Sequence, residues 1–206
     1  TFSPFRDFGK IQSVSVIPII EGYLGREFKS NTEAIIQTPR GLISWWRFES
    51  SDDFLMKNNC RLIRGGLNNT LENGDLLCGN DSSLSLDKDI SISFWIKTLT
   101  QNDSIIQKGD NYKFRLSSGF VTFSYGGVEI KSSSIVNDNS WHHVVATISG
   151  IYIDSVPSSS QFLNPAGEIN SEELEISTKG LLSDVMIFNE SLANIEISGL
   201  YNLQKR

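Results

Sequence analysis

The chain of 206 residues carries 18 basic and 24 acidic side chains, which gives a formal net charge of −6 at pH 7. This acidic balance leaves no basic surface to neutralise phosphates and argues against a nucleic-acid partner. Apolar residues make up 39% of the chain, enough for a substantial core, while 30 serines and 16 asparagines replace much of the usual surface charge. No apolar run approaches the roughly 18 residues of a membrane span. We therefore expect no membrane-spanning segment in the mature chain.

The first 40 residues differ from the rest and are predicted to be an N-terminal tail, residues 1–40, ahead of one domain, residues 41–206. Residues 11–20 are strongly β-prone, and the candidate donor-strand residues within them are Val14, Val16, Ile17 and Ile20. Pro18 cannot donate to a strand ladder, which favours an edge position. Two interpretations remain: the segment is an added edge of its own domain, or a donor strand that completes the sheet of a neighbouring subunit.

Residues 42–48 form the first predicted strand of the domain and contain Trp45 and Trp46. An exposed tryptophan in this run could stack on a sugar ring, but a strand tryptophan is more often part of the core. Two further tryptophans, Trp95 and Trp141, are predicted to be core residues.

Cys60 and Cys78 are the only cysteines and are eighteen residues apart. With no CxxC pair and no neighbouring histidine, the spacing does not fit a zinc site. Separate buried thiols and one disulfide both remain open, and we predict the disulfide because the chain also has features of an exported protein. Four Asn-x-Ser/Thr sequences are candidate glycosylation sites: Asn68, Asn80, Asn102 and Asn189. The chain begins at Thr1 rather than Met, which fits removal of a signal peptide and an extracellular location.

The remainder of the chain consists of short β-prone runs that are separated by Gly, Asn, Asp and Ser. Ser117-Ser118-Gly119 between two such runs is typical of a hairpin. The only helix candidate spans residues 191–201, with Leu192, Ile195 and Leu200 on its apolar side. The other predicted strands are residues 90–96, 112–116, 121–125, 128–130, 141–148, 151–153 and 182–188. Strands without intervening helices predict an all-β antiparallel sandwich of the jelly-roll type.

From about Gly41 to Tyr201, the order of motifs resembles the laminin-G-like branch of the concanavalin-A-like jelly rolls. The motifs are residues 41–48, 91–97, 105–109, 140–147 with 151–154, and 180–189 followed by 192–193 and 200–201. The two histidines, His142 and His143, belong to the fourth motif, and the resemblance implies a structural role for them. Ser155 departs from the family, because a glycine often completes the turn after Tyr152-Ile153-Asp154.

The chemistry-bearing residues do not form a catalytic pattern. Related jelly rolls include glucanases, which need two paired carboxylates, commonly spaced as E-x-D-x-x-E. That spacing is absent, and Glu172, Glu173 and Glu175 are predicted to lie in a solvated turn. Calcium is an open alternative, since relatives sometimes bind it through loop oxygens. The candidate ligands here are Asp81, Asp103, Asp110 and Asn111, without regular spacing.

Two functions follow as hypotheses. The first is a non-enzymatic, glycosylated structural subunit of a cell-surface filament, which polymerises with itself by inserting its N-terminal strand into the next sandwich. This hypothesis uses an analogy with archaeal thread-like fibres. The second is a lectin-like module for adhesion that binds surface glycans or proteins.

Overall fold

The computed structural model describes residues 40–48, 60–159 and 167–205, together with four short strands nearer the N-terminus. The chain divides into two compact units, Thr1–Pro39 and Arg40–Arg206. In the first unit, β1 (Val14–Val16) pairs with β4 (Phe28–Ser30), and β2 (Ile19–Ile20) pairs with β3 (Tyr23–Leu24). Val14, Val16 and Ile20 thus lie in strands that pair inside their own chain. Ile17 lies outside the described residues, so intermolecular donation stays a prediction.

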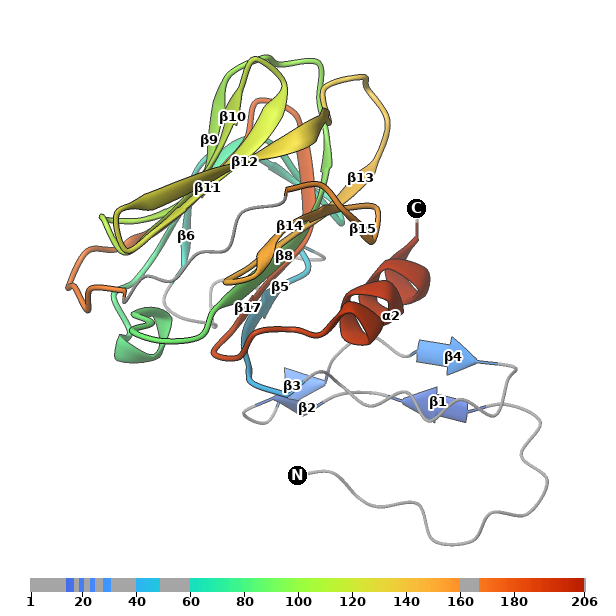
Figure 1. The fold of residues 1–206 in the computed structure, drawn as a ribbon, viewed down its shortest axis with the longest axis horizontal. Coiled ribbons are helices and arrows are strands. Elements are labelled where there is room, and N and C mark those ends of the chain that lie inside the picture. Colours follow the sequence, from blue (N-terminus) through green and yellow to red (C-terminus); the bar gives the residue numbers. More distant parts are fainter. Residues whose placement is uncertain are drawn as a thin grey trace, which may run out of the picture. The chain divides into compact units, whose positions relative to one another are not determined.

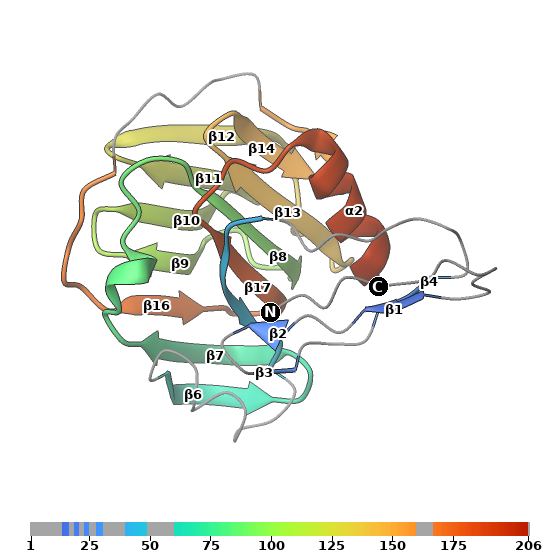
Figure 2. The same ribbon diagram turned by 90° about the horizontal axis from the view of Figure 1, so that it is seen from below.

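The second unit is built on a long antiparallel sheet whose strands follow each other in hydrogen-bonded order. One half contains, in spatial order, β6 (Arg61–Leu67), β7 (Leu71–Cys78), β16 (Leu174–Ser177), β9 (Asp103–Lys108), β10 (Tyr112–Ser117), β11 (Phe120–Tyr125) and β12 (Val128–Ile135). Figure 2 shows these strands in this order. The sequence prediction of an all-β antiparallel jelly roll is confirmed.

The other half contains β5 (Leu42–Trp46), β17 (Leu181–Phe188), β8 (Ser91–Lys97), β13 (His142–Thr147), β14 (Gly150–Ile153) and β15 (Val156–Pro157). The two halves are joined where β17 pairs with β7, through Leu181 opposite Glu72 and Leu182 opposite Leu71. A single turn of 3-10 helix, η1 (Ser82–Leu84), and one α-helix, α2 (Asn194–Gln204), complete the described part of the unit.

The core lies between the two halves of the sheet. Phe94 of β8 meets Phe114 of β10 edge to face, with 5.1 Å between ring centroids, and Phe114 contacts Phe123 of β11 at 4.6 Å. All three phenylalanines are completely buried, and each burial contributes roughly 1.5–3 kcal/mol. The alternation of apolar and polar residues in the strands follows directly from this arrangement, because every second side chain points into the core.

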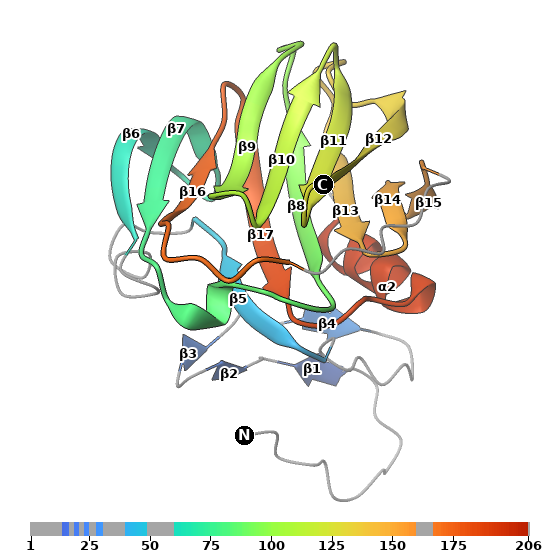
Figure 3. The ribbon, with the colours of Figure 1, turned by 60° about the vertical axis from the view of Figure 1, so that its left-hand side comes forward.

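Helix α2 covers the outer face of the second half. Figures 1 and 3 show the helix beside β8, β13 and β14, on the side away from β9–β12. Tyr201 of the helix stacks on Trp95 of β8 at 5.7 Å, and Gln204 accepts a hydrogen bond from the Trp95 indole at 3.3 Å. Trp95 is therefore a core residue, as predicted. Trp45 and Trp46 are also buried, but Trp141 is only half-buried, so its assignment to the core was wrong.

The sequence prediction was also wrong for two segments. No strand is among the predicted elements between the two cysteines, whereas the structure forms a hairpin there, in which β6 and β7 pair antiparallel. The segment expected to be a solvated turn holds strand β16, and Glu175 lies within it. Among the described residues, no helix combines the length and the apolar composition needed to cross a membrane.

Candidate functional site

Cys60 and Cys78 form a disulfide, which confirms the predicted pairing. The bond closes the base of the β6–β7 hairpin, and both cysteines are buried. Trp46 donates an indole hydrogen bond to the Cys60 sulfur at 3.1 Å, so the bridge is part of the core. Its role is structural.

The four predicted glycosylation sites all lie at strand ends or in turns, with exposed side chains: Asn68, Asn80, Asn102 and Asn189. Asn68 is in the turn between β6 and β7, where its N–H bonds to the Thr70 carbonyl. All four side chains are therefore accessible, and the Asn80 side-chain nitrogen donates to the Ser171 carbonyl at 3.3 Å. Occupancy of the sites stays a prediction.

The predicted calcium ligands do not converge. Asp81 caps η1 by accepting from the Ser83 N–H at 2.8 Å, and Asp103 accepts from the Lys179 N–H at 2.7 Å. Asp110 pairs with the Lys113 ammonium at 2.7 Å, whereas Asn111 is buried and donates to a carbonyl in another loop. Within the described ranges, no three His, Cys, Asp or Glu side chains gather as metal ligands would.

His142 and His143 point to opposite faces of β13, as expected for adjacent strand residues. The His143 ring is buried and pairs with the Ser93 hydroxyl through Nε2 at 2.8 Å. Burial lowers the pKa of His143 to about 4, because the protonated ring would lose its hydration. His143 is therefore a neutral packing residue beside Trp95.

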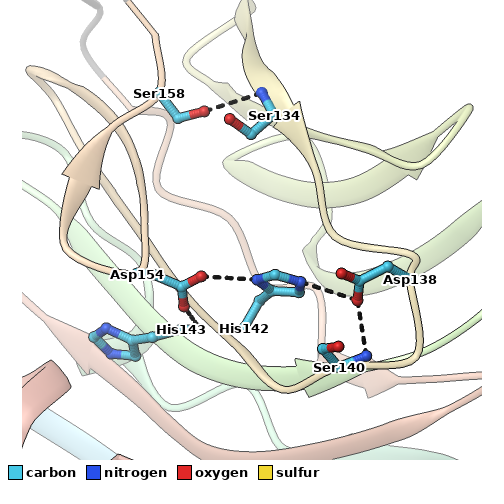
Figure 4. A network of polar contacts seen from close by, with 7 residues as sticks. All are labelled: Ser134, Asp138, Ser140, His142, His143, Asp154 and Ser158. Carbon is cyan, nitrogen blue, oxygen red and sulfur yellow. Dashed lines mark hydrogen bonds and ion pairs between the residues drawn. The ribbon is translucent and has the colours of Figure 1, made fainter.

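His142 lies at the centre of a polar network that joins the loop before β13 to the turn after β14 (Figure 4). Its Nδ1 is 2.8 Å from an oxygen of Asp154, and its Nε2 is 3.1 Å from an oxygen of Asp138. The hydrogen bond with Asp154, followed by that with Asp138, raises the pKa of His142 despite burial. Among the described residues, both ring nitrogens of His142 are bonded to carboxylates rather than to a hydroxyl or a thiol, so the network clamps two loops together.

The carboxylates of this network are held in their charged form. Burial of Asp154 opposes ionisation, but hydrogen bonds from His142 and from the His143 N–H outweigh it, and the Asp154 pKa is lowered. The pKa of Asp138 is lowered chiefly by the Ser140 N–H, 2.7 Å away. On the same edge, Ser158 accepts from the Ser134 N–H and ties β12 to the end of β15 (Figure 4).

The outer face of the first half of the sheet presents a different kind of surface, polar and open. Its side chains form two rows across five strands, because they are opposite one another in the strand register. One row, linked throughout by the register, is Glu129, Ser124, Lys113, Gln107 and Glu175. The other row is Lys131, Thr122, Arg115 and Ser104, linked in the same way, and Ser177, whose hydroxyl donates to the Ser104 carbonyl. Thr122 is the one buried member of the two rows. We call these ten residues the outer face. Figure 3 shows the strands that carry them, which are β12, β11, β10, β9 and β16.

The groups of the outer face are held in place by one another. Glu129 accepts from the Arg115 guanidinium and, at 2.9 Å, from the Ser124 hydroxyl. The Lys131 ammonium lies 4.4 Å from the centre of the Phe120 ring on the same face. With three cations and two carboxylates, the outer face has a net charge of +1, in contrast to −6 for the chain. Sequence reasoning missed this surface, because β16 is far away in the sequence from the strands beside it.

Comparison with known proteins agrees with this architecture. A profile of the concanavalin A-like lectin/glucanases superfamily matches residues 71–198. No curated protein matches the chain. Among solved structures, the binding domain of Paraclostridial mosquitocidal protein 1 is similar with a TM-score of 0.56 at 19% identity, over 69% of this chain and 45% of that one.

Two botulinum neurotoxin structures are also similar. The binding domain of neurotoxin DC, solved with rat synaptotagmin II, has a TM-score of 0.56 at 17% identity, over 94% of this chain and 52% of that one. A type C structure, described in connection with cell entry that depends on two ganglioside molecules, has a TM-score of 0.54 at 16% identity, over 93% of this chain and 51% of that one. The chain spans about half the length of these domains, and at such identity the likeness concerns the fold. Since the profile matches more than half of the chain and the sheet has the matching architecture, the chain belongs to the concanavalin A-like lectin/glucanase superfamily.

Proposed function

We propose that the chain is a non-enzymatic, lectin-like module that binds a glycan on the outer face. The observation that carries this proposal is the contrast between the two halves of the sheet. One half has helix α2 packed over its outer surface, whereas the other presents two rows of hydroxyl, amide, ammonium, guanidinium and carboxylate groups. Sugar hydroxyls both donate and accept hydrogen bonds, so they suit such an array.

The relatives support binding rather than catalysis. Two of the similar solved structures are binding domains, one of them in complex with synaptotagmin II, and a third concerns cell entry that depends on two ganglioside molecules. Those partners belong to domains twice as long as this chain, so a protein partner is the alternative to a glycan. The three cations of the outer face favour a glycan that carries a carboxylate over a neutral one.

A glycan array probed with the full chain tests the proposal. We expect retention of acidic glycans, and we expect Arg115→Ala or Lys131→Ala to weaken binding about tenfold, because each removes one charge-assisted contact. Lys88→Ala is the matched control, since Lys88 is an exposed cation in a loop outside the outer face. Wild-type affinity in both outer-face variants, with thermal unfolding unchanged, would exclude this surface. Repeating the array with a chelator tests the calcium alternative.

A second candidate, the filament subunit, follows from the separate compact unit at residues 1–39 and its β-prone segment. We propose for this case that residues 11–20 exchange their pairing inside the chain for pairing with a second copy. Light scattering of the exported protein would then show polymers, and deletion of residues 1–22 would leave monomers. Normal fibres from the truncated chain would contradict the filament candidate.

An extracellular location with occupied glycosylation sites fits either candidate. We propose glycans on at least two of Asn68, Asn80, Asn102 and Asn189, whose side chains are all exposed. The intact mass of the chain from its native source, before and after enzymatic deglycosylation, measures this directly. A native mass equal to that of the bare polypeptide would contradict it.

A further inference from the structure

Lys108 is a lysine without surface exposure at the end of β9. Its ammonium donates to the Asn170 side-chain oxygen at 3.4 Å and to the Glu172 carbonyl. Burial lowers the pKa of Lys108, and the nearby Glu172 charge offsets part of this effect. A desolvated lysine is a nucleophile when its amine is neutral.

The Asn170 carboxamide is held against this amine from both ends. Its oxygen also accepts from the Glu172 N–H at 3.2 Å, and its nitrogen donates to the Lys108 carbonyl at 3.2 Å. The backbone is fixed as well, because the Ser85 hydroxyl donates to the Asn170 carbonyl at 2.9 Å. The pairing of β16 with β9 places Leu174 opposite Lys108 and so brings the preceding segment alongside the lysine.

This arrangement has the parts of an acyl transfer. The Glu172 N–H polarises the amide carbonyl and would stabilise negative charge on its oxygen. The Glu172 side chain is exposed, its Cβ and Cγ lie next to Gly109, and its charge acts on the Lys108 ammonium, so its carboxylate is the group placed to accept the proton of the lysine. The carboxamide carbon is only about 1.2 Å beyond the oxygen that Lys108 already contacts.

We propose that Lys108 and Asn170 form an intramolecular isopeptide bond. Glu172 takes a proton from the ammonium, and the neutral amine attacks the carboxamide carbon, forming the Nζ–Cγ bond. The bond from Cγ to the side-chain nitrogen then breaks. Glu172 returns its proton to that nitrogen, and the second proton that Nζ loses on becoming an amide nitrogen also passes to it, so that it leaves as ammonium. Atoms and electrons balance without an oxidant or a cofactor. The product is a cross-link between β9 and the segment before β16 that reducing agents do not break.

Mass spectrometry of the reduced and alkylated full chain tests the proposal. We expect the intact mass to be lower than the sequence mass by one ammonia molecule. After trypsin digestion, we expect Lys108 to be uncleaved and joined to the peptide that contains Asn170. An intact mass equal to the sequence mass, or free tryptic peptides ending at Lys108, would overturn the proposal.

Two variants separate the isopeptide from other losses of ammonia. Asn170 is followed by Ser171, so a cyclic imide at this asparagine would lower the mass equally. Lys108→Arg removes the attacking amine but leaves Asn170 able to form the imide. If the isopeptide causes the loss of ammonia, this variant should have the mass calculated from its sequence. Glu172→Gln keeps the backbone contacts and should slow the reaction at least tenfold. Lys113→Arg, at an accessible lysine of the next strand, is the control and should keep the wild-type loss.

Discussion

The adjacent histidines of β13 show how burial and charge set opposite protonation states on neighbouring residues. His143 lies against Trp95, with 5.1 Å between ring centroids, and burial depresses its pKa to about 4. His142 faces Asp154 and Asp138, and hydrogen bonds to their carboxylates raise its pKa. The His143 ring is neutral because it is buried away from water, and the protonated form of His142 is favoured because it is hydrogen-bonded to carboxylates.

Acidification should therefore destabilise the fold through His143. Its folded pKa lies below the unfolded value of 6.5, so the unfolded chain binds the extra proton, and stability falls as pH falls between 6.5 and about 4. From pH 7 to pH 5, we expect wild type to lose about 2 kcal/mol more than His143→Gln. Denaturant unfolding at both pH values measures this. Equal losses in the two proteins would contradict it.

His142 acts with the opposite sign. Its folded pKa is raised, so its contribution is fully present below the unfolded value of 6.5 and is lost as pH rises through the folded pKa. Asp138 and Asp154, with lowered pKa values, contribute above their unfolded values and lose that contribution in acid. The edge that these residues join is consequently most stable at pH values above those at which the two carboxylates become protonated and below those at which His142 loses its proton.

Ser155 occupies the turn between β14 and β15 in the left-handed region, with φ of 66°, next to Asp154 at 52°. A side chain there costs about 1–2 kcal/mol, whereas glycine accepts the conformation. Ser155→Gly should raise the free energy of unfolding by about 0.5 kcal/mol after the entropy cost of glycine. Ser149→Gly, in the neighbouring turn at a position without positive φ, should lower it. Thermal unfolding of both variants provides the comparison.

At the residue scale, the sequence predicted what depends on alternation along a strand. It identified the opposite faces of His142 and His143, the core position of Trp95 and the disulfide. It misplaced Trp141, because this residue directly precedes β13 and is only half-buried. Alternation does not indicate where coverage ends.

Among the elements, helix α2 shows how tertiary contacts override a local pattern. The predicted start at Ser191 is wrong by three residues, because the Leu192 N–H bonds to the Ser91 hydroxyl and keeps the chain extended. The helix then begins at Asn194, and the Glu196 carboxylate accepts the Ala193 N–H. Of the predicted apolar side, Leu192 and Leu200 are buried, whereas Ile195 is exposed and Ile197 is buried instead.

Two substitutions on this helix should differ sharply in their effect. Ile197 is fully buried, so Ile197→Ala should lower the free energy of unfolding by about 2–4 kcal/mol. Ile195 is 80% exposed, and Ile195→Ala should change stability by less than about 0.5 kcal/mol. Chemical denaturation of the pair is the measurement. Similar losses in both would mean that the helix register is different.

Two of the strands that the sequence missed, β6 and β16, share a physical cause. Strand β6 is exposed along nearly its whole length, so it shows no apolar alternation. Strand β16 has only four residues and follows two exposed glutamates, which disguise it as a turn. Each of these strands is stabilised by pairing with β7 rather than by its own composition.

For the whole molecule, the sequence predicted the fold class but not the candidate binding surface. Motif order was enough for a jelly roll, because short alternating strands without helices have few other solutions. The outer face instead depends on β16 lying between β7 and β9, although about seventy residues separate β16 from β9 in the chain. Such an array of side chains becomes visible only when the strand order is known.

The last prediction concerns the independence of the sandwich unit. Every residue of the described core cluster lies between Trp46 and Ile187, and the disulfide closes inside the same unit. Because the core and its cross-link lie within residues 40–206, we expect a chain without residues 1–39 to fold, form the Cys60–Cys78 bond and bind glycans as the full chain does. Denaturant unfolding, thiol titration and the glycan array compare the two chains. An unfolded truncated chain would mean that residues 1–39 supply part of the fold, whereas a folded chain that no longer binds would place the ligand site on those residues.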